Sequence, residues 1–226
     1  MTNLSTSQEE ADTIIILHSL YADTEAAKED LDIIVRSPDT DVFILLLSYC
    51  HKFKHHLYFD TGNSNKRRII HIQALCEKIK REIQESILGL HAFTGCDSIS
   101  AFVQKGKKKP LTLLLKHLEF VPAFKELGER DTLSQDMLLQ LERFVCHLYG
   151  KPTHSSVNKL RFDLVRQKYF LKGQSPLSCV HGLDISLLPP CQQALRMHIM
   201  RANYQAHIWK QAHIGHPDIP NPSGHG

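Results

Sequence analysis

The chain has 226 residues, 42% of them hydrophobic and 23% charged, which are ordinary values for a globular protein. This length allows one large domain, or one domain with an extension. The net charge of +3 is too small to indicate a polyelectrolyte partner by itself, and no apolar run of roughly 18 residues suggests a membrane span. Six cysteines occur without a C-x-x-C pair, which argues against a zinc ribbon or a disulfide framework. We therefore expect a protein of the nucleus or cytoplasm that is not secreted.

A helix is predicted to begin near Ser7, where a capping-box pattern precedes apolar residues at helical spacing. Its first turn carries Glu9, Glu10 and Asp12. Acids at this position commonly complement the helix dipole, and this alternative stays open. Residues two apart point to opposite sides of a helix, so Glu10 and Asp12 converge only if Glu10 lies at the non-helical entry. Glu9 shares a face with Asp12 and is kept as a reserve candidate.

Residues 31–49 predict a strand followed by a buried helix. The apolar run 31–35 is typical of a fully buried parallel strand, and Ser37 is predicted to cap the helix that follows. Asp39 and Asp41 then lie at the C-terminal edge of a core strand, where open α/β sheets bind ligands. Two adjacent carboxylates repel each other, so a bound divalent cation would explain the pair. Complementing the dipole of the helix is the equal alternative.

The next segments predict a β-hairpin and a helix. Residues 56–60 and 68–72 have strand composition and flank a polar tip, which Lys66 and Arg67 make basic. Residues 73–84 have apolar positions at helical spacing and predict one amphipathic helix.

Residues 86–116 predict a helix, a glycine-centred basic turn and a second helix. An apolar segment ends at Asp97, a short helix is expected over residues 98–103, and residues 111–115 resume as helix. The basic turn between them consists of Lys105, Gly106, Lys107, Lys108 and Lys109. Such a turn presents backbone N–H and ammonium groups to a phosphate backbone without reading bases. A solvated lysine-rich loop is the alternative.

Three motifs in chain order resemble those of the flap-endonuclease group within the PIN-like 5′ nucleases: Glu10-Ala11-Asp12, Ser37-Pro38-Asp39-Thr40-Asp41, and Gly95-Cys96-Asp97 followed by Gly106 and Lys108. That family has E-A-E at a helix start, D-x-D after a core strand, and G-x-D before a basic turn in a helix-turn-helix element that holds the DNA backbone. The resemblance covers about residues 7–115, half the chain. The chain as a whole, including residues 188–209, also resembles animal proteins associated with mobile elements.

The resemblance implies two-metal phosphodiester hydrolysis with two Mg²⁺ or Mn²⁺ ions about 4 Å apart in a carboxylate cage. The positions that match the metal ligands of the family are Glu10, Asp12, Asp39, Asp41 and Asp97. The catalytic candidates among them are Asp39, Asp41 and Asp97. The implied partner is nucleic acid, with DNA expected. Its phosphates would be gripped, with salt-dependent and sequence-independent affinity, by Lys105, Gly106, Lys107, Lys108 and Lys109.

The chain also departs from the family. The family has two earlier strands that each carry a metal-binding aspartate, and nothing before Glu10 supplies them. Gln104 stands where the first of two glycines in the basic turn would be. We therefore expect the C-terminal part of a longer protein or a degenerate copy, catalytically incomplete as given. The alternative function is a catalytically inactive nucleic-acid-binding or scaffold remnant of the same fold.

The expected fold class is α/β, with a partial parallel PIN-like sheet flanked by helices and followed by a helical C-terminal region. The helices expected in that region cover residues 131–149, 158–169 and 192–212. The expected divisions are a nuclease core with the helix-turn-helix element at 1–116, a helical extension at 117–215 and a disordered tail at 216–226.

Overall fold

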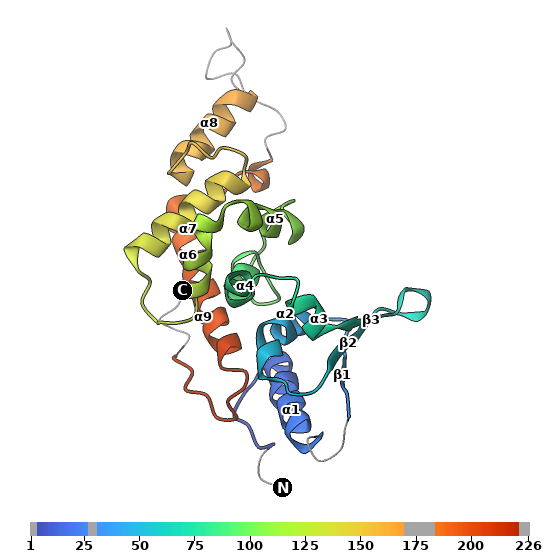
Figure 1. Cartoon of the computed structure of the whole chain (residues 1–226). Helices are drawn as coiled ribbons and strands as arrows, with labels where there is room; N and C mark the ends of the chain where they lie inside the picture. The colour runs from blue at the N-terminus through green and yellow to red at the C-terminus, as the bar shows by residue number, and fades with distance from the viewer. Residues whose placement is uncertain (1–3, 27–30, 170–183, 222–226) are drawn as a thin grey trace.

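The computed structural model describes residues 4–26, 31–169 and 184–221. Within these ranges the chain is a mixed α/β protein with nine α-helices and one small three-stranded sheet. Two parts of the expected C-terminal region, residues 170–183 and 222–226, lie outside the described residues. The sheet lies toward one end of the molecule, and helix α8 (Val157–Tyr169) lies at the other (Figure 1).

The sheet has the strand order β1-β2-β3, with bounds β1 (Ile33–Arg36), β2 (Leu57–Thr61) and β3 (Arg68–His71). β1 runs parallel to β2, with Ile33 opposite Leu57. β2 and β3 form the predicted antiparallel hairpin, with Tyr58 opposite His71. The parallel pairing and the hairpin are thus confirmed.

The prediction that β1 is buried on both faces is wrong. Val35 is buried between the sheet and its helices, whereas Ile34 on the opposite face is 61% exposed. Ile69 of β3 is exposed on that same face. An apolar run shows that a strand suits a core, but it does not show whether a second layer covers both of its faces.

Helix α1 (Ala11–Ala26) begins four residues later than Ser7, so the capping-box prediction is wrong. The preceding segment is held instead by the other end of the chain. The hydroxyl of Thr6 donates to the carbonyl of Gly215 at 2.7 Å, and the Ser7 amide donates to the same carbonyl at 3.0 Å. These long-range bonds replace the local cap. They leave Glu10 at the non-helical entry, the condition under which it converges with Asp12.

Helix α2 (Thr40–Tyr49) is buried as predicted, with Leu45 and Leu46 fully inaccessible. Its N-cap is Asp39 and not Ser37, because the Asp39 carboxylate accepts from the Asp41 amide at 2.8 Å. The Ser37 hydroxyl, two residues before this N-cap, accepts from the Asp39 amide at 3.0 Å. The corner between β1 and α2 is therefore closed by two consecutive side-chain caps.

The predicted helix over residues 73–84 is wrong in its extent. The segment forms a short α3 (Ile72–Cys76), and a new helix, α4 (Arg81–Phe93), continues through the apolar stretch that follows. α4 packs against α2, against α6 (Val121–Glu126) and against α9 (Gln192–Lys210). It is therefore the central helix of the molecule.

The short helix predicted over residues 98–103 is absent. Gly95 has a φ of +103°, and the chain then makes a tight turn in which Cys96 and Ile99 pair as an antiparallel bridge. Gln104 and Gly106 also have positive φ values, 58° and 55°, so the chain turns again before α5 (Lys108–Lys116). The basic turn therefore joins α4 to α5 through an irregular linker.

The C-terminal helices are confirmed as α7 (Gln135–Leu148), α8 and α9. Short 3₁₀ helices occur at Cys50–Lys52, Ser64–Lys66, Leu118–Phe120 and Ile185–Leu187. One continuous hydrophobic core includes Leu45 of α2, Phe93 of α4, Phe124 of α6 and Trp209 of α9. None of the helices within the described ranges is both long enough and apolar enough to cross a membrane.

Candidate functional site

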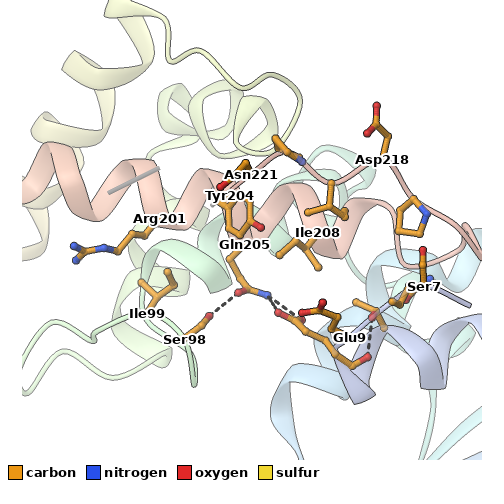
Figure 2. Close-up of a pocket in the computed structure, with 16 residues that line it drawn as sticks. Ser7, Glu9, Ser98, Ile99, Arg201, Tyr204, Gln205, Ile208, Asp218 and Asn221 are labelled. Atoms are coloured by element: carbon orange, nitrogen blue, oxygen red, sulfur yellow. Dashed lines mark hydrogen bonds between the residues drawn. The ribbon is translucent and has the colours of Figure 1, made fainter. Parts of the chain in front are cut away.

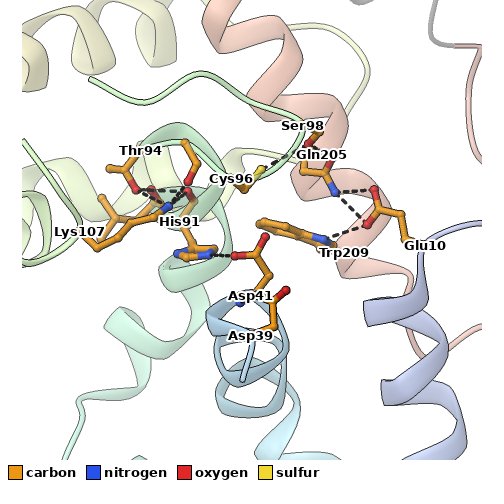
Figure 3. Close-up of polar contacts among 12 residues, drawn as sticks. Glu10, Asp39, Asp41, His91, Thr94, Cys96, Ser98, Lys107, Gln205 and Trp209 are labelled. Carbon is orange, nitrogen blue, oxygen red and sulfur yellow. Dashed lines mark hydrogen bonds and ion pairs between the residues drawn. The ribbon is translucent and has the colours of Figure 1, made fainter. Parts of the chain in front are cut away.

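Four of the five predicted acids lie within electrostatic range of the fifth, Asp12, in the first turn of α1. The pKa of Asp12 is raised to about 6, first by burial and then by the charges of Asp39, Asp41, Glu10 and Asp97. These charges come from the entry to α1, the start of α2 and the turn after α4. Because α1 and α2 pack side by side, their first turns open toward the same space below α9 (Figure 3).

Glu10 is bound by the C-terminal helix. Its two carboxylate oxygens accept from the Gln205 amide at 2.8 and 3.0 Å, and one of them also accepts from the Trp209 indole N–H at 3.1 Å. The Gln205 side-chain oxygen accepts in turn from the Ser98 hydroxyl at 2.5 Å (Figure 3). Helix α9 thus fixes both Glu10 and the turn that contains Asp97. No local sequence pattern signals these contacts, which span up to 199 positions.

Asp41 pairs with a histidine that the sequence analysis missed. His91 of α4 lies 2.7 Å from Asp41 through its Nε2 atom and is only 4% exposed. Its ring packs against the Trp209 indole, with 5.6 Å between centroids. The available signal was one polar residue inside the otherwise apolar run from Ile87 to Phe93.

The remaining acids differ in their contacts. One Asp39 oxygen caps α2, which is the role that the dipole alternative anticipated. The carboxyl groups of Asp12 and Asp97, in contrast, form no hydrogen bond or ion pair with any described residue. These two, together with the second oxygen of Asp39, are the least engaged acceptors in the cluster.

The carboxylate oxygens of these acids suit a hard divalent cation, since Mg²⁺ and Mn²⁺ prefer such ligands. The arrangement itself is not a closed cage. In the described part of the chain, no group of three or more His, Cys, Asp or Glu side chains could hold a metal ion as placed. The other four acids lie within electrostatic range of Asp12, but no three of them are placed to share one ion.

The lysines of the basic turn fall into two groups. The Lys107 ammonium donates to the carbonyl oxygens of His91, at 2.8 Å, and of Gly95, and to the Thr94 hydroxyl at 3.1 Å. It closes the C-terminal end of α4, and burial of the ammonium lowers the pKa of Lys107 to about 8. Lys105 lies over the Tyr149 ring, 3.8 Å from its centroid.

Gly106, Lys108 and Lys109 are exposed, and the two lysines begin helix α5. Cations at a helix N-terminus oppose its dipole, which makes this end of α5 electrostatically suited to an anion. This group is therefore accessible to solvent and to an anion, whereas the Lys107 ammonium is committed to the protein itself.

A hollow of about 870 Å³ lies beside Glu10 (Figure 2). The α1 entry with Glu9 forms one wall, Arg201 and Tyr204 of α9 form another, and residues 217–221 cross above it. Burial, followed by the charges of Glu9 and Glu10, raises the pKa of Tyr204. The described start of the expected tail thus lines this hollow, and the reserve candidate Glu9 lines it together with Glu10.

No protein-family model, curated protein or solved structure matches the chain.

Proposed function

We propose that the acid cluster is a Mg²⁺- or Mn²⁺-dependent site for phosphodiester hydrolysis in nucleic acid, on a PIN-like fold. The supporting observation is that acids from three separate segments lie close enough to Asp12 for their charges to raise its pKa. The mutual repulsion of such a cluster is relieved when a divalent cation enters it.

The residues that would hold a cation are Asp12, Asp39 and Asp97, which have free carboxylate oxygens, with Asp41 oriented by His91. A bound ion would supply an activated water and would stabilise the leaving oxygen. Glu10 would join only after exchanging its bonds to Gln205 and Trp209. The exposed lysines Lys108 and Lys109 would contact backbone phosphates, preferably of DNA.

Two observations favour a second candidate function, a catalytically inactive nucleic-acid-binding or scaffold remnant. Both Glu10 oxygens already have donors, and the acids of the described chain form no ready coordination group. In this alternative the acids have a structural role, because Glu10 is bound by α9 and Asp41 by α4. Only the exposed lysines would still bind nucleic acid.

The test is cleavage of flap, nicked and linear DNA with and without Mg²⁺ or Mn²⁺, combined with calorimetric titration of Mn²⁺. Asp12→Asn and Asp97→Asn remove oxygens that have no structural contact, so we expect both to abolish Mn²⁺ binding and cleavage. Asp131→Asn, at an exposed position in the α6–α7 linker, is the control and should leave both unchanged.

Cation binding without cleavage would favour the inactive remnant. Cleavage that survives both substitutions would place the active site elsewhere and contradict the proposal.

A further inference from the structure

β1 is an edge strand whose outer side has no partner strand among the described residues. The strand is also exposed on one face, where Ile34 is 61% accessible and the Arg36 side chain is 70% accessible. An unpaired edge with an exposed apolar residue is a template for pairing with another strand.

The backbone hydrogen bonds show which residues face that edge. The amides of Ile33 and Ser37 donate to β2, to the carbonyls of His56 at 2.8 Å and of Asp60 at 3.1 Å. Backbone groups alternate sides along a strand, so Asp32, Ile34 and Arg36 direct their N–H and C=O groups outward.

A two-fold axis at Ile34 would place the outward N–H and C=O groups of one β1 strand opposite the same groups of a second copy. In an antiparallel pairing of two β1 strands, Ile34 would face Ile34 of a second copy, and Arg36 would face Asp32 in both directions. The pairs fall at hydrogen-bonded positions, and their side chains share the exposed face. Each strand thus offers opposite charges at equal distances on either side of one apolar residue.

Arg36 has little else to bind. Its guanidinium is 4.0 Å from Asp60, and that carboxylate is already held by Arg67 through bonds of 2.8 and 2.7 Å. Asp32 is exposed. The charges that the pairing requires are therefore accessible in the monomer.

We propose that the β1 edge binds a second copy of this chain, forming a two-fold dimer with a continuous six-stranded sheet. The pairing is isologous, so it closes without producing fibres. It is independent of the acid cluster and of the proposed hydrolysis.

The test is the mass of the full chain in solution, followed by light scattering over a range of concentrations. The wild-type chain should show a concentration-dependent dimer. Asp32→Arg and Arg36→Asp each turn two attractive pairs into repulsive ones and should raise the dimer Kd roughly tenfold or more. The double variant Asp32→Arg with Arg36→Asp restores the opposite charges and should restore the dimer.

Ile34→Lys should also abolish the dimer, because it brings two like charges together at the axis. The matched control is Ile69→Lys, which adds the same charge at a 58% exposed position of the same face on β3 and should leave the dimer intact. A chain that is monomeric at every concentration would overturn the proposal, as would a double variant that fails to dimerise while its circular dichroism matches the wild type.

Discussion

At the scale of single residues, the acid cluster brings like charges together, and the rest of the fold holds them there against their repulsion. Asp12 is partly buried, has no hydrogen-bond donor in the described chain, and lies in the field of four other acids. Its charged form is therefore disfavoured in the folded chain. An acid whose pKa is raised by folding destabilises the native state wherever that acid must ionise.

The sign of the effect on stability follows from the raised pKa. Between the ordinary value of 3.8 and about 6, the folded chain binds more protons at Asp12 than the unfolded chain does, so the free energy of unfolding falls as pH rises through this window. Above that window, without divalent cations, Asp12→Asn should be more stable than the wild type by about 1 kcal/mol, because solvent screens part of the repulsion at this partly exposed group. The advantage should vanish near the lower end of the window.

Chemical denaturation of both chains across this pH range measures the difference. Asp131→Asn serves as the control and should show no pH-dependent gain. A gain for Asp12→Asn that is the same at all pH values would contradict the assignment to ionisation.

At the scale of elements, α4 determines how the two halves of the chain meet. Gly89 lies on the face of α4 that contacts α6, and a Cβ added there would overlap the carbonyl of Phe124 and lie 3.1 Å from the Leu127 side chain. The two helices are therefore as close as their backbones allow. This proximity also fixes the C-terminal end of α4, from which His91 reaches Asp41.

Gly89→Ala should destabilise the fold by on the order of 2 kcal/mol, because backbone atoms of α6 cannot yield as a flexible side chain would. Urea unfolding measures the change. Helix propensity alone would favour alanine over glycine, so a loss of stability would come from the contact with α6. Glu82→Ala, on the exposed face of the same helix, is the control and should be close to neutral. A stable Gly89→Ala variant would mean that α6 moves freely away from α4.

The elements that the sequence predicted well are those with strong local signals. The parallel β1 followed by α2, the β2–β3 hairpin and helices α7 to α9 all have clear periodicity or turn chemistry. The start of α1 was missed because a long-range bond to Gly215 replaced the capping box at Ser7. The helix predicted over residues 98–103 is absent because Gly95 and Gln104 adopt positive φ values, which the residue pattern did not reveal.

The candidate site was only partly predictable, for a related reason. The acids were located by spacing and by resemblance, but their partners depend on tertiary contacts that no local pattern encodes. His91 reaches Asp41 across 50 positions, and Trp209 reaches Glu10 across 199. The role of Lys107 was likewise hidden, since a lysine that caps a helix and a lysine that grips phosphate look identical in a basic run.

At the scale of the whole molecule, α9 joins the parts that the sequence suggested as separate divisions. Gln205 and Trp209 bind Glu10, and Gln205 also accepts from the Ser98 hydroxyl at 2.5 Å. The core is continuous from α2 to α9. We therefore expect the described chain to unfold as one cooperative unit.

Gln205→Leu keeps the side-chain volume near that of glutamine but removes the donor to Glu10 and the acceptor for Ser98. Leaving a part-buried carboxylate short of a donor should lower stability by about 1–3 kcal/mol. Amide exchange should also become faster at residues 5–10, because their anchor to α9 is weakened.

Thermal unfolding and hydrogen exchange measure the two effects. Gln193→Leu, at an exposed position of the same helix, controls for the added hydrophobic surface. Exchange at residues 5–10 that is unchanged in Gln205→Leu would show that the bonds to Gly215 alone hold that segment.

The bond from Thr6 to Gly215 spans 209 positions, and this separation has a consequence for the order of events during synthesis. Glu10 leaves the ribosome well before the helix that binds it, because 195 positions separate it from Gln205. The intervening segment must therefore be made while that carboxylate is still hydrated and unanchored. The acid cluster is assembled only after α9 has been made, so a polypeptide interrupted before α9 would carry all five acids without ever bringing Glu10 to its place.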